Sequence, residues 1–517
     1  MVKIMDLRRN GYLILLLVLL GGDYEVGVKG ENNVVFSVEH KFGGRGRSVL
    51  KDLKDHDVRR HGRMLAAADF QLGGNGSPTG AALYFTKLSI GTPSKDYHVQ
   101  VDTGSDLFWV NCARCLRCPT KSKLGIDLVQ YDLQASTTGK SITCEQDVCS
   151  AMFNAASSEC KVGKPCEYLV TYGDGSSTGG YFVKDNIYLD QVSGDYKTSS
   201  LQGTVAFGCS SQQSGDLGTS TNAVDGIIGF GEANSSVISQ LAAAGTVKKM
   251  FAHCLDGVKG GGIFAIGQVV EPKVNSAPLV PNSWPHGGGI FAIGQVVEPK
   301  VNSAPLVPNR AHYTLSLKDI EVGKEVLDIP TSLFESKSSK KAIIDSGTTL
   351  VYLPSKAYNA LMNKLMSKQP QLKTHHLDGD FDCFIYSGNV DDGFPAVTFQ
   401  FVGNLSLTAY PHDYLFEVRD NEWCIGWQEG TQGKDGNEIY LLGDLLLSNK
   451  LVLYDLEKQT IGWTQYDCSS SIKVKDETSG NVYTVGAHKI SSASSLDSRM
   501  AFTFFLSIIS FFCFLLK

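Results

Sequence analysis

Two stretches of the chain share one pattern, Val99-Gln-Val-Asp102-Thr-Gly-Ser105 and Ala342-Ile-Ile-Asp345-Ser-Gly-Thr348. In each, an apolar run typical of a strand leads into an aspartate, and a glycine and a hydroxyl residue follow two and three positions later. One Asp-Thr-Gly tripeptide is a common turn and indicates little. Two copies, each after an apolar strand, predict two carboxylates that are presented in the same way at the ends of strands.

Paired carboxylates suit one kind of chemistry. Two like charges held close together cannot both ionise, so one carboxyl stays protonated and polarises a carbonyl while the other activates water. A hydrolase built this way needs neither a metal nor a covalent nucleophile. We therefore interpret Asp102 and Asp345 as the catalytic pair of a hydrolase with no cofactor and no metal.

Three further motifs accompany the aspartates. Each aspartate is followed later in the chain by an apolar-apolar-Gly strand, at Asp225-Gly-Ile-Ile-Gly229 and Leu441-Leu-Gly-Asp444. Tyr172-Gly-Asp-Gly-Ser176 lies between Asp102 and the first of these strands, and Trp109 follows the first aspartate. With these motifs in this order over residues 84–468, the chain resembles the pepsin family of aspartic proteases.

The resemblance implies a mainly β, two-lobed fold with a cleft between two barrel-like lobes. It implies an aspartic endopeptidase with an acid pH optimum that acts on peptides and proteins, is inhibited by pepstatin-type compounds and is a monomer. Tyr172, Gly173, Asp174 and Trp109 match the substrate-covering flap and its support. The residues that match the surroundings of the dyad are Thr103, Gly104, Ser105, Ser346, Gly347 and Thr348. The alternative is a weakly active or inactive binding or inhibitor protein of the same fold.

Bulk properties agree with this reading. A chain of 517 residues is longer than one hydrophobic core usually supports, so two or more lobes are expected. The net charge of -6 argues against nucleic-acid binding, which usually needs a basic surface. Short apolar stretches bounded by glycine, proline and serine predict many strands and tight turns. One helix is expected over Ser355–Lys368.

Twelve of the 13 cysteines lie between Cys112 and Cys468, after a start that looks secretory, which predicts disulfides. Zinc is the lesser alternative for Cys112-x2-Cys115-x2-Cys118, because no histidine follows at ligand spacing. Seven cysteines in an insert at 112–166, together with the flap sequence, resemble the nepenthesin-like, atypical plant branch. The resemblance implies that one of the seven pairs with Cys209, and implies the pairs Cys383–Cys424 and Cys254–Cys468. The candidates are Cys112, Cys115, Cys118, Cys144, Cys149, Cys160, Cys166, Cys209, Cys254, Cys383, Cys424 and Cys468.

The chain termini predict export and membrane attachment. Residues 1–22 are expected to be a cleaved signal peptide and not a membrane anchor. Residues 23–80 are rich in basic groups and glycine, and are interpreted as a removable prosegment or, alternatively, a solvated linker. The uncharged tail within 500–517 predicts a GPI-attachment signal at Ser491 or Ser492, with a true transmembrane helix as the alternative. Residues 469–499 would then be a flexible polar tether outside the plasma membrane.

The two lobes are expected at 81–256 and 257–468. The second contains an anomaly, because Gly260–Asn282 recurs letter for letter as Gly287–Asn309. With flanking residues the duplicated units span 260–286 and 287–313. Two copies cannot build a solenoid, and a β core has no place for a second copy of one strand pair, so one copy is expected to loop out.

The chain also contains a Gly-x-Ser-x-Gly pattern and three glycosylation sequons. Gly175-Ser-Ser-Thr-Gly179 fits the Gly-x-Ser-x-Gly nucleophile elbow, but a strand-like run follows where that elbow needs a helix, which predicts a hairpin. Asn75, Asn234 and Asn404 each begin an Asn-x-Ser glycosylation sequon, and the first would leave with the prosegment.

Overall fold

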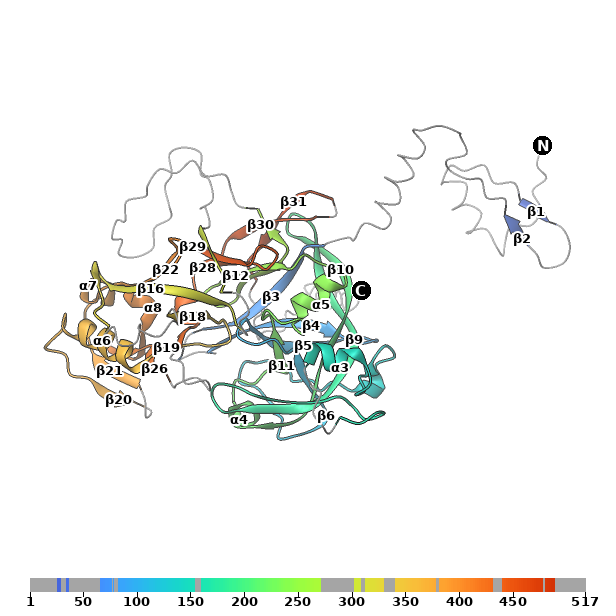
Figure 1. Cartoon of the computed structure of the whole chain (residues 1–517), viewed down its shortest axis with the longest axis horizontal. Coiled ribbons are helices and arrows are strands. Elements are labelled where there is room, and N and C mark those ends of the chain that lie inside the picture. Colours follow the sequence, from blue (N-terminus) through green and yellow to red (C-terminus); the bar gives the residue numbers. More distant parts are fainter. Residues whose placement is uncertain are drawn as a thin grey trace, which may run out of the picture. The chain divides into compact units, whose positions relative to one another are not determined.

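The computed structural model describes most of the chain between Ala66 and His488 (Figure 1). The described residues are 26–28, 34–36, 66–76, 78, 82–153, 160–270, 302–307, 312–329, 340–377, 381–430, 439–477 and 479–488. The chain divides into two compact units, Met1–Arg63 and Met64–Lys517. In the first, the described residues form one antiparallel pair, β1 (Val26–Val28) and β2 (Val34–Phe36). Everything that follows concerns the second unit.

A 14-stranded sheet forms the first lobe and continues into the base that both lobes share. Part of the strand Lys95–Asp102 alternates buried and half-buried residues, because one face packs on the core, whereas the strands Met250–Leu255 and Gly262–Ile266 are buried throughout. In spatial order they are β15 (Asn302–Pro305), β29 (Thr460–Gln465), β28 (Lys450–Asp455), β12 (Met250–Leu255), β13 (Gly262–Ile266), β3 (Ala68–Asn75), β4 (Leu83–Ile90), β5 (Lys95–Asp102), β11 (Gly226–Gly229), β6 (Trp109–Leu116), β10 (Lys197–Ser214), β9 (Ser177–Gly194) and β7 (Lys140–Ser141), with β8 (Glu167–Thr171) paired to β9.

The second lobe adds two smaller sheets. The larger has the order β23 (Ser406–Ala409), β22 (Val397–Phe401), β16 (Thr314–Val322), β18 (Lys341–Ile344), β27 (Tyr440–Leu442), β19 (Val351–Leu353) and β26 (Trp427–Glu429), with β17 (Glu325–Val326) on β16. The other has the order β20 (His375–Leu377), β21 (Phe381–Ile385), β25 (Glu422–Ile425) and β24 (Leu415–Arg419). The expected mainly β, two-lobed pepsin-like architecture is confirmed.

Helices are short. They are α3 (Asp147–Phe153), α4 (Asp216–Thr219), α5 (Val237–Ala243), α6 (Ser355–Met366), α7 (Val390–Gly393), α8 (Pro411–Tyr414) and α9 (Asp444–Leu447), with a 3-10 turn at Leu133–Ala135. The longest, α6, follows Pro354 and ends two residues before the expected limit. It buries Ala357, Leu361 and Leu365, which lie four residues apart and therefore on one helix face.

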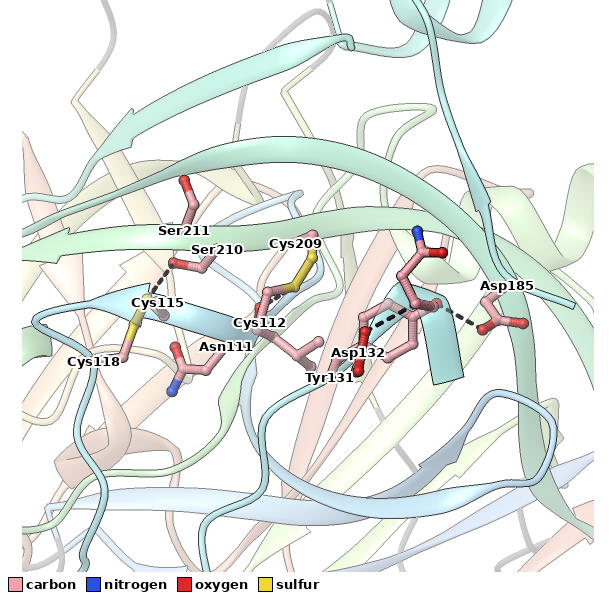
Figure 2. The surroundings of a disulfide bond; sticks show 12 residues. Asn111, Cys112, Cys115, Cys118, Tyr131, Asp132, Asp185, Cys209, Ser210 and Ser211 are labelled. Carbon is pink, nitrogen blue, oxygen red and sulfur yellow. Dashed lines mark hydrogen bonds between the residues drawn. A yellow bond between two sulfur atoms is a disulfide. The ribbon is translucent and has the colours of Figure 1, made fainter. Parts of the chain in front are cut away.

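All twelve cysteines between Cys112 and Cys468 are paired. The pairs are Cys112–Cys209, Cys115–Cys118, Cys144–Cys160, Cys149–Cys166, Cys254–Cys468 and Cys383–Cys424. Figure 2 shows Cys112 of β6 bonded to Cys209 of β10, beside Tyr131, whose hydroxyl donates to Asp185. Cys144, Cys149 and Cys160 have sulfurs close enough for a metal, but their disulfides remove the thiolates that zinc would need.

The first strand of the shared base differs from the sequence interpretation. β3 lies within residues 23–80, which were assigned to a removable prosegment, yet it pairs with both β13 and β4. Its residues Ala68, Phe70 and Leu72 are buried in the core. A cut at residue 80 would therefore remove a paired strand from the 14-stranded sheet. Asn75 is the last residue of β3.

The expected flexible tether also differs, because its first part is folded. β30 (Ser471–Lys475) and β31 (Val482–Gly486) form an antiparallel hairpin, and β30 pairs with β14 (Gln268–Val269). Ile472, Val474 and Val485 are buried. The chain is further tied back by His488, whose imidazole lies 2.7 Å from the Asp69 carboxylate. The alternation Ser-Ile-Lys-Val-Lys is a strand signal that the polar composition of the segment concealed.

The duplicated segment contributes one half from each copy. The first copy supplies β13, which lies between β12 and β3, and β14. The second copy supplies β15, at the edge of the 14-stranded sheet beside β29. The corresponding residues of the other copy, in both cases, lie outside the described residues. The described strands β13, β14 and β15 therefore correspond to one copy of the duplicated segment.

Candidate active site

The strands around the two aspartates have the same topology, and each aspartate with its loop and strands forms one half-site. β5 ends at Asp102, and β11 lies parallel to β5 with Gly229 opposite Asp102 while it also pairs antiparallel with β6. β18 ends one residue before Asp345, and β27 lies parallel to β18 and antiparallel to β19. The two apolar-apolar-Gly strands therefore cross the two aspartate loops, as the sequence indicated.

Each carboxylate is held by its own loop in the same way. The backbone N–H of Gly104 donates to Oδ1 of Asp102 at 2.8 Å, and that of Gly347 donates to Oδ1 of Asp345 at 2.7 Å. The hydroxyl of Ser105 donates to Oδ2 of Asp102. The hydroxyl of Thr348 donates to Oδ2 of Asp345 at 2.7 Å. Four donors thus fix the orientation of two buried carboxylates.

The two loops meet face to face. A Cβ added at Gly104 would overlap the Asp345 carboxylate, and one added at Gly347 would overlap the Asp102 carboxylate. The two carboxyl groups are hydrogen-bonded to each other. Behind them, the N–H of Ser346 donates to Oγ1 of Thr103 at 2.8 Å, which joins the loops across the lobes. Glycine is required at both positions because any side chain would displace the opposite carboxylate.

The electrostatics of the pair leave it with a proton in acid. Burial and the neighbouring charge of Asp345 together raise the pKa of Asp102 to about 7, although the donors Ser105 and Gly104 act in the opposite direction. Such coupled carboxylates release their protons in two steps that belong to the pair. At acid pH the pair therefore holds one proton and one negative charge, the state that general acid and general base catalysis both need.

A third buried carboxyl was not singled out from the sequence. Asp444 opens α9 directly after β27 and is 1% exposed. Burial raises its pKa well above the ordinary value, and the charges of Asp345 and Asp102 add to the effect. Its Oδ1 has no partner among the described residues. A protonated Asp444 adds no charge beside the dyad. Its place directly after Gly443 of the second crossing strand was the signal that could have found it.

The flap is a hairpin of β8 and β9. The N–H of Tyr172 donates to the Ser176 carbonyl, and Gly175 has the positive φ of 82° that the turn requires. Asp174 and Gly173 are exposed, and the Asp174 carboxylate accepts from the Ser176 N–H at 2.9 Å. The strand that follows the turn is β9, so the Gly-x-Ser-x-Gly pattern forms a hairpin and not a nucleophile elbow.

The flap is linked to the first half-site. Trp109 of β6 is buried, and its indole N–H donates to the Tyr172 hydroxyl at 2.7 Å. Burial raises the pKa of Tyr172, and the nearby charge of Asp102 contributes. Tyr172 is therefore a neutral phenol held close to the catalytic pair by the first lobe.

The remaining candidate residues are the glycosylation sequons and the two ends of the chain. Asn234 and Asn404 are exposed, as glycan acceptors must be, and Asn75 lies in β3. Ser491, Ser492, the N-terminal apolar run and the C-terminal tail lie outside the described residues. Within the described part of the chain, no helix has the length and apolar character needed to cross a membrane.

Known proteins resemble the chain over most of its length. Family profiles described as "Xylanase inhibitor N-terminal" and "Xylanase inhibitor C-terminal" match residues 84–268 and 312–465. Aspartic proteinase 36 of Arabidopsis thaliana is 48% identical over 464 residues, which cover 90% of each chain. Aspartic proteinase 39 of the same plant is 44% identical over 493 residues, 95% of each chain. Aspartic proteinase nepenthesin-2 of Nepenthes gracilis is 28% identical over 401 residues, 75% of this chain and 78% of that one.

Solved structures share the fold. The crystal structure of edgp aligns with a TM-score of 0.59 at 18% identity and covers 78% of this chain and 95% of that chain. Basic 7S globulin from soybean aligns with a TM-score of 0.55 at 15% identity, covering 78% and 96%. At these identities the likeness concerns the fold alone.

Proposed function

Because the chain belongs to the pepsin-like aspartic proteinase family of plants, we propose that it is an active aspartic endopeptidase with Asp102 and Asp345 as its catalytic residues. The observation that carries the proposal is the meeting of the two carboxyl groups, which share a hydrogen bond and lie among donors that fix their outer oxygens. Both half-sites have the complete set of an aspartate, a glycine N–H and a hydroxyl donor.

The geometry supports a general acid–base mechanism. The ionised carboxyl of the pair takes a proton from a water molecule as its oxygen attacks the peptide carbonyl carbon. The protonated carboxyl donates to the carbonyl oxygen, so the charge on the pair moves but its proton count is restored. The C–N bond then breaks as the amine leaving group receives a proton from one carboxyl, while a hydroxyl of the hydrated carbonyl gives its proton to the other carboxylate. The products are a carboxylic acid and an amine, and the pair again holds one proton. The flap residue Tyr172 closes over the substrate and excludes bulk water.

The second candidate function is a binding or inhibitor protein without turnover. It is favoured by the description of the matching family profiles, which name an inhibitor. A protein with that role needs no catalytic hydroxyl donors, yet Ser105 and Thr348 both contact the aspartates here. The complete half-sites therefore favour catalysis.

The test is hydrolysis of a denatured protein at acid pH by the purified, processed chain, with and without pepstatin. Asp345→Asn, expressed and purified in parallel, controls for contaminating proteases. We expect fragments from the wild type, none with pepstatin and none from the variant. A folded wild type that yields no fragments would favour the binding role, and fragments from Asp345→Asn would contradict the assigned site.

We further propose that the enzyme is exported, loses a segment ending before Ala66 and is held on the outer face of the plasma membrane by a GPI anchor at Ser491 or Ser492. Support comes from the two apolar terminal segments, the small residues before the second one and the six disulfides, which persist outside the cytosol. Phosphatidylinositol-specific phospholipase should release the enzyme from intact cells. Retention, together with recovery of a Met500–Leu516 peptide from the mature protein, would show a transmembrane tail instead.

A further inference from the structure

A buried histidine and tyrosine lie side by side in the base that the two lobes share. His253 is on β12 and Tyr454 is on the neighbouring antiparallel strand β28 (Figure 1). His253 is 0% exposed and Tyr454 is 1% exposed. The Nε2 atom of His253 lies 3.1 Å from the Tyr454 hydroxyl, within hydrogen-bond distance.

Packing alone does not account for these two polar groups. The Tyr454 ring stacks on Phe251 with centroids 4.4 Å apart, and the His253 ring stacks on Phe264. Phenylalanine would fill both places without burying a hydroxyl or an imidazole. Burying a polar group is unfavourable unless its hydrogen bonds are made, so the Tyr454 hydroxyl, which can both donate and accept, needs a further polar neighbour besides His253.

The anchor is the catalytic loop. The Tyr454 hydroxyl also faces the side chain of Thr103, which lowers the pKa of the phenol and is 0% exposed. Oγ1 of Thr103 accepts the N–H of Ser346 from the opposite half-site. Thr103 directly follows Asp102, and Ser346 directly follows Asp345. A path of polar contacts therefore runs from His253 through Tyr454 and Thr103 to the hydrogen bond that joins the two aspartate loops.

The protonation of this path follows from burial. Burial lowers the pKa of His253 to about 3, so the ring is neutral over most of the acid range. Its Nδ1 has no partner among the described residues. An unpaired buried N–H is rarer than an unpaired acceptor, which places the proton on Nε2 and leaves Nδ1 as a bare lone pair. Nε2–H then donates to the Tyr454 oxygen, which leaves the hydrogen of the Tyr454 hydroxyl available to the Thr103 side chain.

We propose that Tyr454 and His253 are positioning residues of the catalytic pair, which orient the Thr103 hydroxyl so that it accepts the Ser346 N–H and holds the two aspartates at their working separation. Neither residue touches substrate. The inference rests on the proposed protease activity and extends it to a part of the molecule outside the cleft.

The test compares Tyr454→Phe and His253→Phe with the wild type, using pepstatin titration to count active sites. Each variant should lower kcat about tenfold with KM unchanged, because misplacement of reacting groups affects the transition state more than binding. The two limbs of the pH–rate profile should also move closer together, since the coupling of the carboxyls weakens as their spacing loosens. The double variant should be no slower than either single variant. His253→Gln, which keeps an N–H donor, should recover part of the rate.

Tyr131→Phe is the matched control, because it also removes a buried tyrosine hydroxyl, one that donates to Asp185 far from the catalytic loops. It should lower the Tm and leave kcat unchanged. The proposal is overturned if Tyr454→Phe lowers the Tm but leaves kcat and the pH profile at wild-type values. If the wild type itself is inactive, the proposed function fails, and the path is tested by thermal unfolding. Losses in Tm that add in the double variant would then overturn it, whereas non-additive losses would support it.

Discussion

The two half-sites are alike in the loops that hold the carboxylates and unlike in what surrounds them. Gly104 and Ser105 hold Asp102 as Gly347 and Thr348 hold Asp345, atom for atom. In the first lobe, the flap residue Tyr172 lies near Asp102 and is hydrogen-bonded by Trp109. No matching flap is described in the second lobe. The first lobe also contains four of the six disulfides. In the proposed mechanism, catalysis requires both aspartate loops equally, whereas only the flap of the first lobe closes over the substrate.

The largest effect should come from breaking the symmetric part. Asp102→Asn and Asp345→Asn should each lower kcat by about 10⁴-fold or more, because neither carboxyl alone can accept and donate the protons. The losses should be similar for the two variants. Single-turnover assays with equal amounts of folded protein check this. A variant that kept a tenth of the wild-type rate would show that the half-sites are not equivalent.

The asymmetric part should give intermediate effects. Tyr172→Ala should lower kcat/KM about 100-fold, because the flap then neither positions substrate nor excludes water. Trp109→Phe removes only the indole N–H that donates to Tyr172 and should cost about fivefold. Steady-state kinetics with a fluorogenic peptide measure both. Equal losses in the two variants would mean that Trp109 acts on the core and not through the flap.

A smaller effect is expected from the hydroxyl donors. The Ser105 hydroxyl lowers the pKa of Asp102, so Ser105→Ala should raise that pKa further. The pair then keeps its proton to higher pH, and the alkaline limb of kcat/KM should move up by about one pH unit. The matched variant Thr348→Ala removes the equivalent donor from Asp345. An alkaline limb that moved to lower pH in Ser105→Ala would contradict the direction of this effect.

The structural elements that could be predicted from the sequence are those that depend on a local residue pattern. The aspartate loops, both crossing strands and the flap were found because each is a short run with its own turn chemistry. Elements that depend on distant partners were missed. β3 was assigned to a removable segment, since nothing local shows that its residues pair with β13, as Gln71 does with Ile263. The folded hairpin of β30 and β31 was assigned to a tether, because only β14 gives it a place to pack.

The candidate site was likewise predicted only in its local part. Asp102, Asp345, Trp109 and Tyr172 could be read from motifs. Asp444 lies in a quoted motif but was not singled out, and the pair His253–Tyr454 has no local motif. Their role comes from burial and from contacts between strands far apart in the chain. A single histidine in an apolar run is usually a core residue, and only the path to Thr103 distinguishes this one.

The smallest effect should follow removal of one copy of the duplicated segment. Deleting residues 271–297 joins Val270 to Glu298 and leaves one uninterrupted copy, with β13, β14 and β15 all retained. The shortened protein should have wild-type kcat/KM and an equal or slightly higher Tm, because loop-closure entropy changes only weakly with length. Differential scanning calorimetry and the peptide assay check this. A loss of folding would mean that the deleted copy supplies strands to the core.

The central claim is that Asp102 and Asp345 act as a pair that holds one proton. The most direct test is the dependence of kcat/KM on pH for a fluorogenic peptide, measured from about pH 2 to about pH 9. The pKa of Asp102, raised to about 7 by burial and by Asp345, predicts that activity is lost as pH rises through that value, when the pair gives up its last proton. Pepstatin should abolish the activity throughout the active range. Activity that stayed constant or increased above pH 7, with pepstatin present or absent, would contradict the shared proton and with it the proposed mechanism.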